Sequence, residues 1–126
     1  MINPAYALNA YKQTQVETTT NPMELIVMLY DGAMESLDKA AAAMMMKELP
    51  VKIKYIDKGL AIIEELLNSL NAEAGGEIAL QLEDLYFYMI KEITLANISN
   101  DPEKIRHIIV LLKELREAWV HIRNTL

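Results

Sequence analysis

The sequence predicts an all-α protein, an antiparallel up-down four-helix bundle preceded by a short N-terminal helical arm or cap. Apolar residues make up 52% of the 126 residues, whereas glycine and proline occur only four times each, a composition that favours long regular elements. Helix-start signals recur about every 25 residues, at Pro22, Pro50, Gly75-Gly76 and Pro102. Between these positions apolar residues repeat at three- and four-residue intervals, which is the period of an amphipathic helix.

The first 20 residues are predicted to form an arm and a linker. A short helix is expected to begin at Pro4 and reach Lys12, with Leu8 and Tyr11 on the same side. Residues 13–20 are mostly polar or β-branched and have a low helix propensity. Because an isolated helical turn is not stable in water, the arm is expected to rest on another part of the protein.

The first bundle helix is predicted to run from about Pro22 to Lys47. Asn21 can cap free backbone N–H groups, Pro22 suits the first helical position, and Glu24 can complete a capping box. Residues 21–126 are therefore assigned to the bundle.

This helix opens with an uninterrupted apolar or aromatic run at residues 25–30. Since a surface helix needs only one apolar stripe, we expect neighbours to enclose it on several sides, and we assign Met28 and Met89 to the core. Met44–Met46 occupy three successive positions and cannot all face inward. Asp31 follows the run and is expected to make a polar contact between helices.

Three further helices complete the predicted bundle. The second is expected from about Pro50 to Asn71, the third starts near Gly76, and the fourth is capped by Asp101. The short connections make consecutive helices antiparallel neighbours. Residues 1–126 are therefore predicted to form one domain.

The last three helices carry more apolar residues than one stripe each requires. This surplus suggests an apolar groove that receives an amphipathic partner segment. The alternative for each residue is membership of the core, because bundle helices use wide stripes. The residues assigned to the groove are Ile62, Leu66, Tyr86, Phe87, Val110 and Leu111.

Charge and composition argue against several classes of protein. The absence of cysteine excludes disulfides and thiolate metal sites, and the formal charge of −6 disfavours a nucleic-acid partner. No secretory signal is visible, and the longest apolar runs are too short for membrane insertion. We therefore expect a soluble protein of the cytoplasm.

A catalytic or metal site is not predicted. The carboxylate di-iron site of some bundles needs Glu-x-x-His on two helices. Here His107 and His121 share the last helix and follow Lys104 and Ala118 by three positions. We expect no catalytic residue, no metal and no cofactor. A ferritin-like carboxylate enzyme and a helical adaptor that dimerises through its apolar surplus are the alternatives to a partner-binding protein.

Short motifs are spread along the whole chain in a specific order. They are Ala10-Tyr11-Lys12-Gln13, Val16-Glu17-Thr18, Pro22-Met23-Glu24-Leu25-Ile26, Met28-Leu29-Tyr30-Asp31-Gly32-Ala33, Gly76-Glu77-Ile78-Ala79, Leu85-Tyr86, Tyr88-Met89, Ala96-Asn97, Leu115-Arg116 and Ala118-Trp119. In this order and spacing they resemble the flagellar export chaperones called FliS, over almost the full length. The segment before Tyr11 is a few residues longer than is usual in that family.

The resemblance implies an antiparallel helical bundle with a small N-terminal cap and no enzymatic activity. It implies that the protein binds the disordered C-terminal segment of flagellin in the cytoplasm. It also implies that the protein prevents premature polymerisation and aids delivery to the flagellar type III export gate. A co-chaperone or regulator that competes for the same surface is left open as a further partner.

The resemblance also bears on the partner-binding residues. Tyr11 matches a tyrosine of the family's cap region, which governs access to flagellin. Leu8 of the predicted arm is added on its apolar character and not on the resemblance, as are the six surplus residues assigned to the groove.

Overall fold

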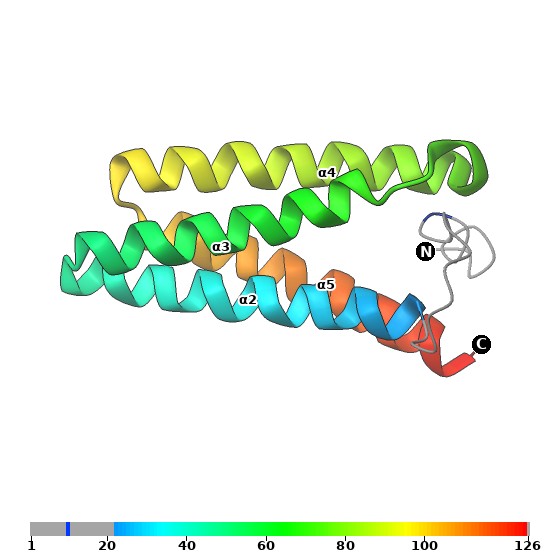
Figure 1. Cartoon of the computed structure of the whole chain (residues 1–126), viewed down its shortest axis with the longest axis horizontal. Coiled ribbons are helices and arrows are strands. Elements are labelled where there is room, and N and C mark those ends of the chain that lie inside the picture. Colours follow the sequence, from blue (N-terminus) through cyan, green and yellow to red (C-terminus); the bar gives the residue numbers. More distant parts are fainter. Residues whose placement is uncertain (1–9, 11–21, 126) are drawn as a thin grey trace.

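Four long helices make up almost all of the chain that the computed structural model describes, namely residue 10 and residues 22–125. Helix α2 spans Pro22–Met46, α3 Leu49–Asn68, α4 Ala72–Ser99 and α5 Pro102–Thr125. The helices lie lengthwise beside one another and alternate in direction (Figure 1). Helix α2 packs against α3 and α5, and α4 packs against the same two helices. The predicted all-α class is confirmed, and the packing order is that of an up-down bundle.

The observed helix bounds differ from the predicted ones by a few residues. Helix α2 begins at Pro22, as expected, and ends just before Lys47, whose positive φ of 57° breaks the helical backbone. Helix α3 ends at Asn68, short of Asn71. Asn71 instead caps the next helix, since its side chain accepts a hydrogen bond from the backbone N–H of Ala74 at 3.2 Å.

The start of α4 was predicted too late. The helix begins at Ala72, and Gly76, with φ 59° and ψ −136°, forms a kink inside it. Glycine adopts this positive φ without the steric cost that other residues meet. The glycine that was expected to start the helix therefore interrupts it. At the other end, Asp101 caps α5 as predicted, accepting from the backbone N–H of Lys104 at 3.2 Å.

The opening helix is less enclosed than the sequence predicted. The side chains of Met28 and Leu25 are 62% and 42% exposed, so the assignment of Met28 to the core is wrong. Tyr30 is fully buried and fixes the inner face of α2. Met28 and Tyr30 are two residues apart, so their side chains point in directions about 200° apart around the axis of α2. Because Tyr30 faces the core, Met28 must point outward.

The other methionine predictions are confirmed. Met89 is fully buried. Of the three consecutive methionines at positions 44–46, only Met44 faces the core, while Met45 and Met46 are exposed. Asp31 forms the predicted contact between helices, an ion pair with Arg116 that joins α2 to α5.

A polar cluster lies inside the apolar core. The indole N–H of Trp119 donates to the hydroxyl oxygen of Tyr30 at 3.1 Å, and the hydroxyls of Tyr30 and Tyr86 hydrogen bond to each other. All three side chains are fully buried. The cluster joins α2, α4 and α5 at one point. Burial raises the pKa of Tyr30 well above its usual value, and Tyr86 adds to the shift.

One residue of the predicted arm lies within the described part. Ala10 is fully buried, and its carbonyl oxygen accepts a hydrogen bond from the backbone N–H of Asn71 at 2.7 Å. A Cβ atom added to Gly75 would lie 2.8 Å from the Cα atom of Ala10. Ala10 therefore packs against the start of α4. Leu8, Tyr11 and the rest of the predicted arm lie outside the described residues.

We predict that Tyr30→Phe lowers the free energy of unfolding by about 1–3 kcal/mol, because it removes a buried hydroxyl that hydrogen bonds to two other helices. Urea unfolding followed by circular dichroism measures this loss. Tyr88→Phe, at a partly exposed tyrosine of α4, serves as the control and should change stability by less than about 0.5 kcal/mol. Equal losses in the two variants would contradict the structural role of the cluster.

The raised pKa of Tyr30 predicts a loss of stability in alkali. Folding disfavours the ionised phenolate, so the stability contribution is complete below the unfolded tyrosine pKa of about 10 and declines above it. Urea midpoints at about pH 9 and about pH 11 should therefore fall further for the wild type than for Tyr30→Phe. Parallel declines would argue against a specific contribution from this hydroxyl.

We predict that Gly75→Val displaces Ala10 while the bundle stays folded. A Cβ at this position would lie 2.9 Å from the Cβ atoms of both Ala10 and Ala79, too close for either to remain in place. The hydrogen bond from the Asn71 amide to Ala10 would then be lost, and amide exchange measured by NMR should accelerate at Asn71. Ala74→Val, at the exposed neighbouring position, is the control. Unchanged protection of Asn71 in Gly75→Val would contradict the contact.

Candidate functional site

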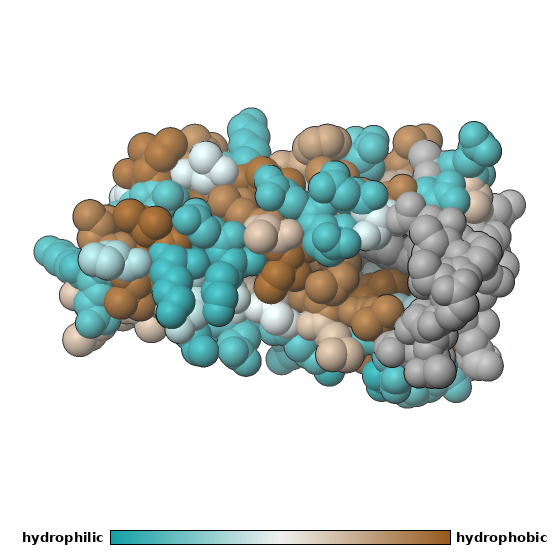
Figure 2. All heavy atoms as spheres, viewed as in Figure 1, coloured by the Kyte–Doolittle hydropathy of each residue, from teal (hydrophilic) through white to brown (hydrophobic). Residues whose placement is uncertain are grey.

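An apolar groove of about 530 Å³ lies between the first turns of α2 and the last turns of α3. Helix α2 supplies its apolar wall. Glu65 of α3 and Ser69, the residue that follows this helix, form a polar rim in which the hydroxyl of Ser69 donates to the carboxylate of Glu65 at 3.2 Å. Seen as in Figure 1, brown spheres gather over this part of α2 and α3 (Figure 2). The lining residues are Pro22, Leu25, Ile26, Met28, Leu29, Glu65 and Ser69.

The groove is apolar because of the rotation of α2. The core-facing side of this helix contains Met23, Ile26 and Tyr30, which leaves Leu25 and Met28 on the outer side. Leu29 is half-buried at the boundary between the two. A helix with six successive apolar or aromatic residues thus covers its core and presents a second apolar surface.

Two glycines allow α2 and α3 to approach each other beside this groove. A Cβ atom on Gly32 would lie 3.2 Å from Cδ1 of Ile62, and one on Gly59 would lie 2.9 Å from Cδ2 of Leu37. Ile62 therefore packs directly against α2. Ile62 is half-buried and lies three residues before Glu65, about one turn nearer the start of α3.

The residues assigned to the groove from the sequence take three different positions. Leu66 and Tyr86 are fully buried in the core, while Ile62 and Leu111 are half-buried and pack against it. Phe87 and Val110 are each 55% exposed, on α4 and α5 respectively. Contact of Leu66 or Tyr86 with a partner stays a prediction, and it would require the core to open. Leu8 and Tyr11 lie outside the described residues.

Leu25, Met28 and Leu29 line the groove although none of them was predicted to do so from the sequence. The sequence feature that could have indicated this is the unbroken run of apolar or aromatic residues at 25–30, which covers more of the helix surface than one apolar stripe. It was interpreted as a sign of enclosure, whereas the excess lines a groove on the surface.

Helix α4 carries a second exposed apolar strip. Leu80, Phe87 and Ile98 are 52%, 55% and 77% exposed, and their spacing of seven and eleven residues puts them on one side of the helix. Asp84 and Lys91 interrupt the strip. Brown spheres along the upper edge of Figure 2 mark apolar surface on α4.

A smaller apolar pocket of about 130 Å³ lies between α4 and α5. It is formed by the first half of α4 and the second half of α5, which places it at the same end of the bundle as the groove (Figure 1). Its lining residues are Ile78, Gln81, Leu82, Leu85 and Leu115. Apolar concavities therefore lie on both sides of this end.

Several ionisable residues form ion pairs along one helix or between two helices. Glu103 pairs with Arg106 at 2.8 Å, and His107 and His121 are exposed. Within residues 22–125 and at residue 10, no three His, Asp or Glu side chains come together in a way that could hold a metal ion. In the same part of the chain, no helix combines the length and the apolar character needed to cross a membrane.

Comparison with known proteins identifies one family. The sequence matches the family described as "Flagellar protein FliS" over residues 2–126. The flagellar secretion chaperone FliS of Vibrio cholerae is 38% identical over 119 residues, which cover 92% of this chain and 88% of the relative. The chaperone of the same name from Campylobacter jejuni is 36% identical over 118 residues, which cover 94% of this chain and 91% of the relative. The FliS chaperone of Salmonella typhimurium is 37% identical over 122 residues, which cover 94% of this chain and 90% of the relative.

These relatives are named as flagellar secretion chaperones, a non-enzymatic family, in agreement with the prediction that this protein is not an enzyme. A chaperone of this kind implies a secretion substrate as its partner. The match over nearly the whole sequence and the agreement in fold class show that the chain belongs to the FliS family of flagellar secretion chaperones.

Proposed function

We propose that this protein is a cytoplasmic export chaperone that binds the disordered C-terminal segment of flagellin. In this role it prevents premature polymerisation and aids delivery of the subunit to the gate of the flagellar type III export apparatus. The observation that carries the proposal is the exposed apolar groove between α2 and α3 in a member of this family.

The groove has the chemistry that a disordered partner requires. A segment that becomes ordered on binding loses conformational entropy, and buried apolar area has to offset that loss. Leu25, Met28 and Leu29 offer apolar side chains in a concave surface. Methionine is flexible and polarizable, so Met28 can adapt to partner side chains of different shapes.

The distribution of apolar surface supports an extended partner. The groove lies on the α2/α3 side, the smaller pocket on the α4/α5 side, and the strip that includes Phe87 on the outside of α4. A long segment that wraps around the bundle can contact all three surfaces, whereas a compact partner on one side cannot. Val110, Ile62 and Leu111 are the further candidates along such a path.

The N-terminal arm is proposed to act as a lid. Ala10 packs against the start of α4, at the end of the bundle where both apolar concavities lie. An arm held at this point can govern access to the groove, and Leu8 and Tyr11 flank Ala10 in sequence. Release of the arm would expose apolar surface for the segment.

The direct test is calorimetric titration of the protein with a purified C-terminal segment of flagellin. We expect a one-to-one complex and a negative ΔCp, because apolar surface is buried. The absence of heat and of co-elution at micromolar concentrations would contradict the proposal. A concentration-independent dimer in light scattering without flagellin would instead favour the dimerising adaptor.

A matched pair of variants locates the binding surface. Met28 and Met45 are the same residue on the same helix and are 62% and 60% exposed, but only Met28 lines the groove. Burial of a methionine side chain contributes about 1.5–3 kcal/mol, so Met28→Asp should weaken binding of the segment at least tenfold, by roughly 1.4 kcal/mol or more. Met45→Asp should leave the affinity within about twofold. Equal effects of the two variants would exclude the groove as the main contact.

A further inference from the structure

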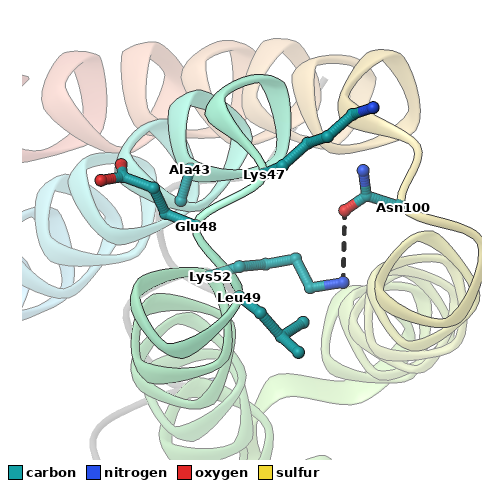
Figure 3. A pocket seen from close by; sticks show the side chains of 6 residues that line it. All are labelled: Ala43, Lys47, Glu48, Leu49, Lys52 and Asn100. Carbon is teal, nitrogen blue, oxygen red and sulfur yellow. Dashed lines mark hydrogen bonds between the residues drawn. The ribbon is translucent and has the colours of Figure 1, made fainter.

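A pocket of about 250 Å³ lies at the opposite end of the bundle, where α2 ends, α3 begins and α4 ends. Figure 3 shows the side chains that line it, which are Ala43, Lys47, Glu48, Leu49, Lys52 and Asn100. Ala43 is 18 residues along α2 from Leu25, a distance of about 27 Å at 1.5 Å per residue. The pocket is therefore separate from the groove.

Lys52 is a buried cation in this pocket. Its side chain is only 6% exposed, and its ammonium group donates to the carbonyl oxygen of Asn97 at 3.0 Å and to the side-chain oxygen of Asn100 at 3.2 Å. Both acceptors are uncharged. Within the described ranges, no carboxylate lies at ion-pair distance from Lys52. An ammonium group has three N–H donors, so one remains for a further acceptor.

Backbone dipoles balance this charge only in part. The carbonyl ends of α2 and α4 meet near Lys52, and Asn100 links them by donating from its side-chain amide to the carbonyl oxygen of Met44 at 3.3 Å. A helix C-terminus carries about half a negative charge, and it is screened near the surface. A buried charge is costly unless it is paired, so an anion beside Lys52 would be favourable.

The surroundings of Lys52 favour an anion over a cation. Lys47 and Glu48 also line the pocket, and the ammonium group of Lys47 and the carboxylate of Glu48 both point away from Lys52, which leaves Lys52 as the charged group beside Asn100 (Figure 3). Lys47, Lys52 and Glu48 give the pocket a formal charge of +1, from two positive groups and one negative group, whereas the chain as a whole carries a charge of −6. The pocket is thus suited to a carboxylate.

The remainder of the pocket is apolar. Ala43 and Leu49 line it, and at the same end Met46 and Ile98 are 71% and 77% exposed. Its volume lies below the range of roughly 300–1,000 Å³ that holds drug-sized ligands. The space therefore fits the last residue or two of a chain better than a chain that passes through.

We propose that this pocket binds the C-terminal carboxylate of the exported segment together with an apolar side chain close to that terminus. The inference rests on the proposed function, because the partner is then a segment that ends in a free carboxylate. About eight residues in extended conformation span the 27 Å between the groove and the pocket. One segment can therefore occupy both sites, and its end lies where α2, α3 and α4 meet.

The test compares two synthetic peptides with the sequence of the flagellin C-terminal segment, one with a free C-terminal carboxylate and one with a C-terminal amide. The free carboxylate should bind the wild-type protein about five- to tenfold more tightly, as expected for a charge-assisted hydrogen bond. In Lys47→Met and Lys52→Met this difference should shrink to about twofold or less, because the cations that recognise the carboxylate are reduced. Lys113→Met, at an exposed lysine of α5, is the control and should retain the full difference.

The outcomes separate this inference from the proposed function. Equal affinities of the two peptides for the wild-type protein overturn the inference and leave the proposed function intact. A preference for the free carboxylate that persists in both lysine variants also overturns it. If neither peptide binds, the proposed function fails and the inference fails with it. Should Lys52→Met not fold, Lys47→Met and the amidated peptide still decide the matter.

Discussion

The hydrogen-bonded cluster of Tyr30, Tyr86 and Trp119 is the constraint on which the rest of the structure depends. A buried hydroxyl or indole N–H needs a polar partner, and inside an apolar core these groups satisfy one another. Apolar packing alone tolerates many rotations of a helix about its axis. The hydrogen bonds define one rotation each for α2, α4 and α5, because only that rotation brings the three side chains together.

The exposed surface follows from this choice of rotation. With Tyr30 buried, Met28 and Leu25 lie on the opposite side of α2 and line the groove. With Tyr86 buried, Phe87 is about 100° further around α4 and faces outward. Helix α4 packs against α3 and α5 and is apolar on both its inner and outer sides. The cluster joins it to α2 across the bundle and determines which apolar side chains remain available to a partner.

Much of the fold could be predicted from local signals, whereas the site could not. Periodicity and caps such as Asp101 depend on neighbouring residues, so helix number, order and approximate bounds are readable. The side of a helix that faces the core is not readable where the apolar run is continuous. For this reason Met28 was assigned to the core, and the buried Leu66 and Tyr86 were grouped with the exposed Phe87. The burial of Lys52 depends on the end of α4, 45 residues away in sequence, and no local pattern indicates it.

We propose that the bundle stays folded when it binds an exported segment, and that it binds through side chains that the buried cluster keeps on the surface. Methyl NMR of protein labelled at methionine tests it most directly, because Met28 lies in the groove and Met89 in the core. On titration with the flagellin C-terminal segment, we expect a large shift of the Met28 methyl signal and little change at Met89. An unchanged Met28 signal, or a large shift of Met89 that reports repacking of the core, would contradict it.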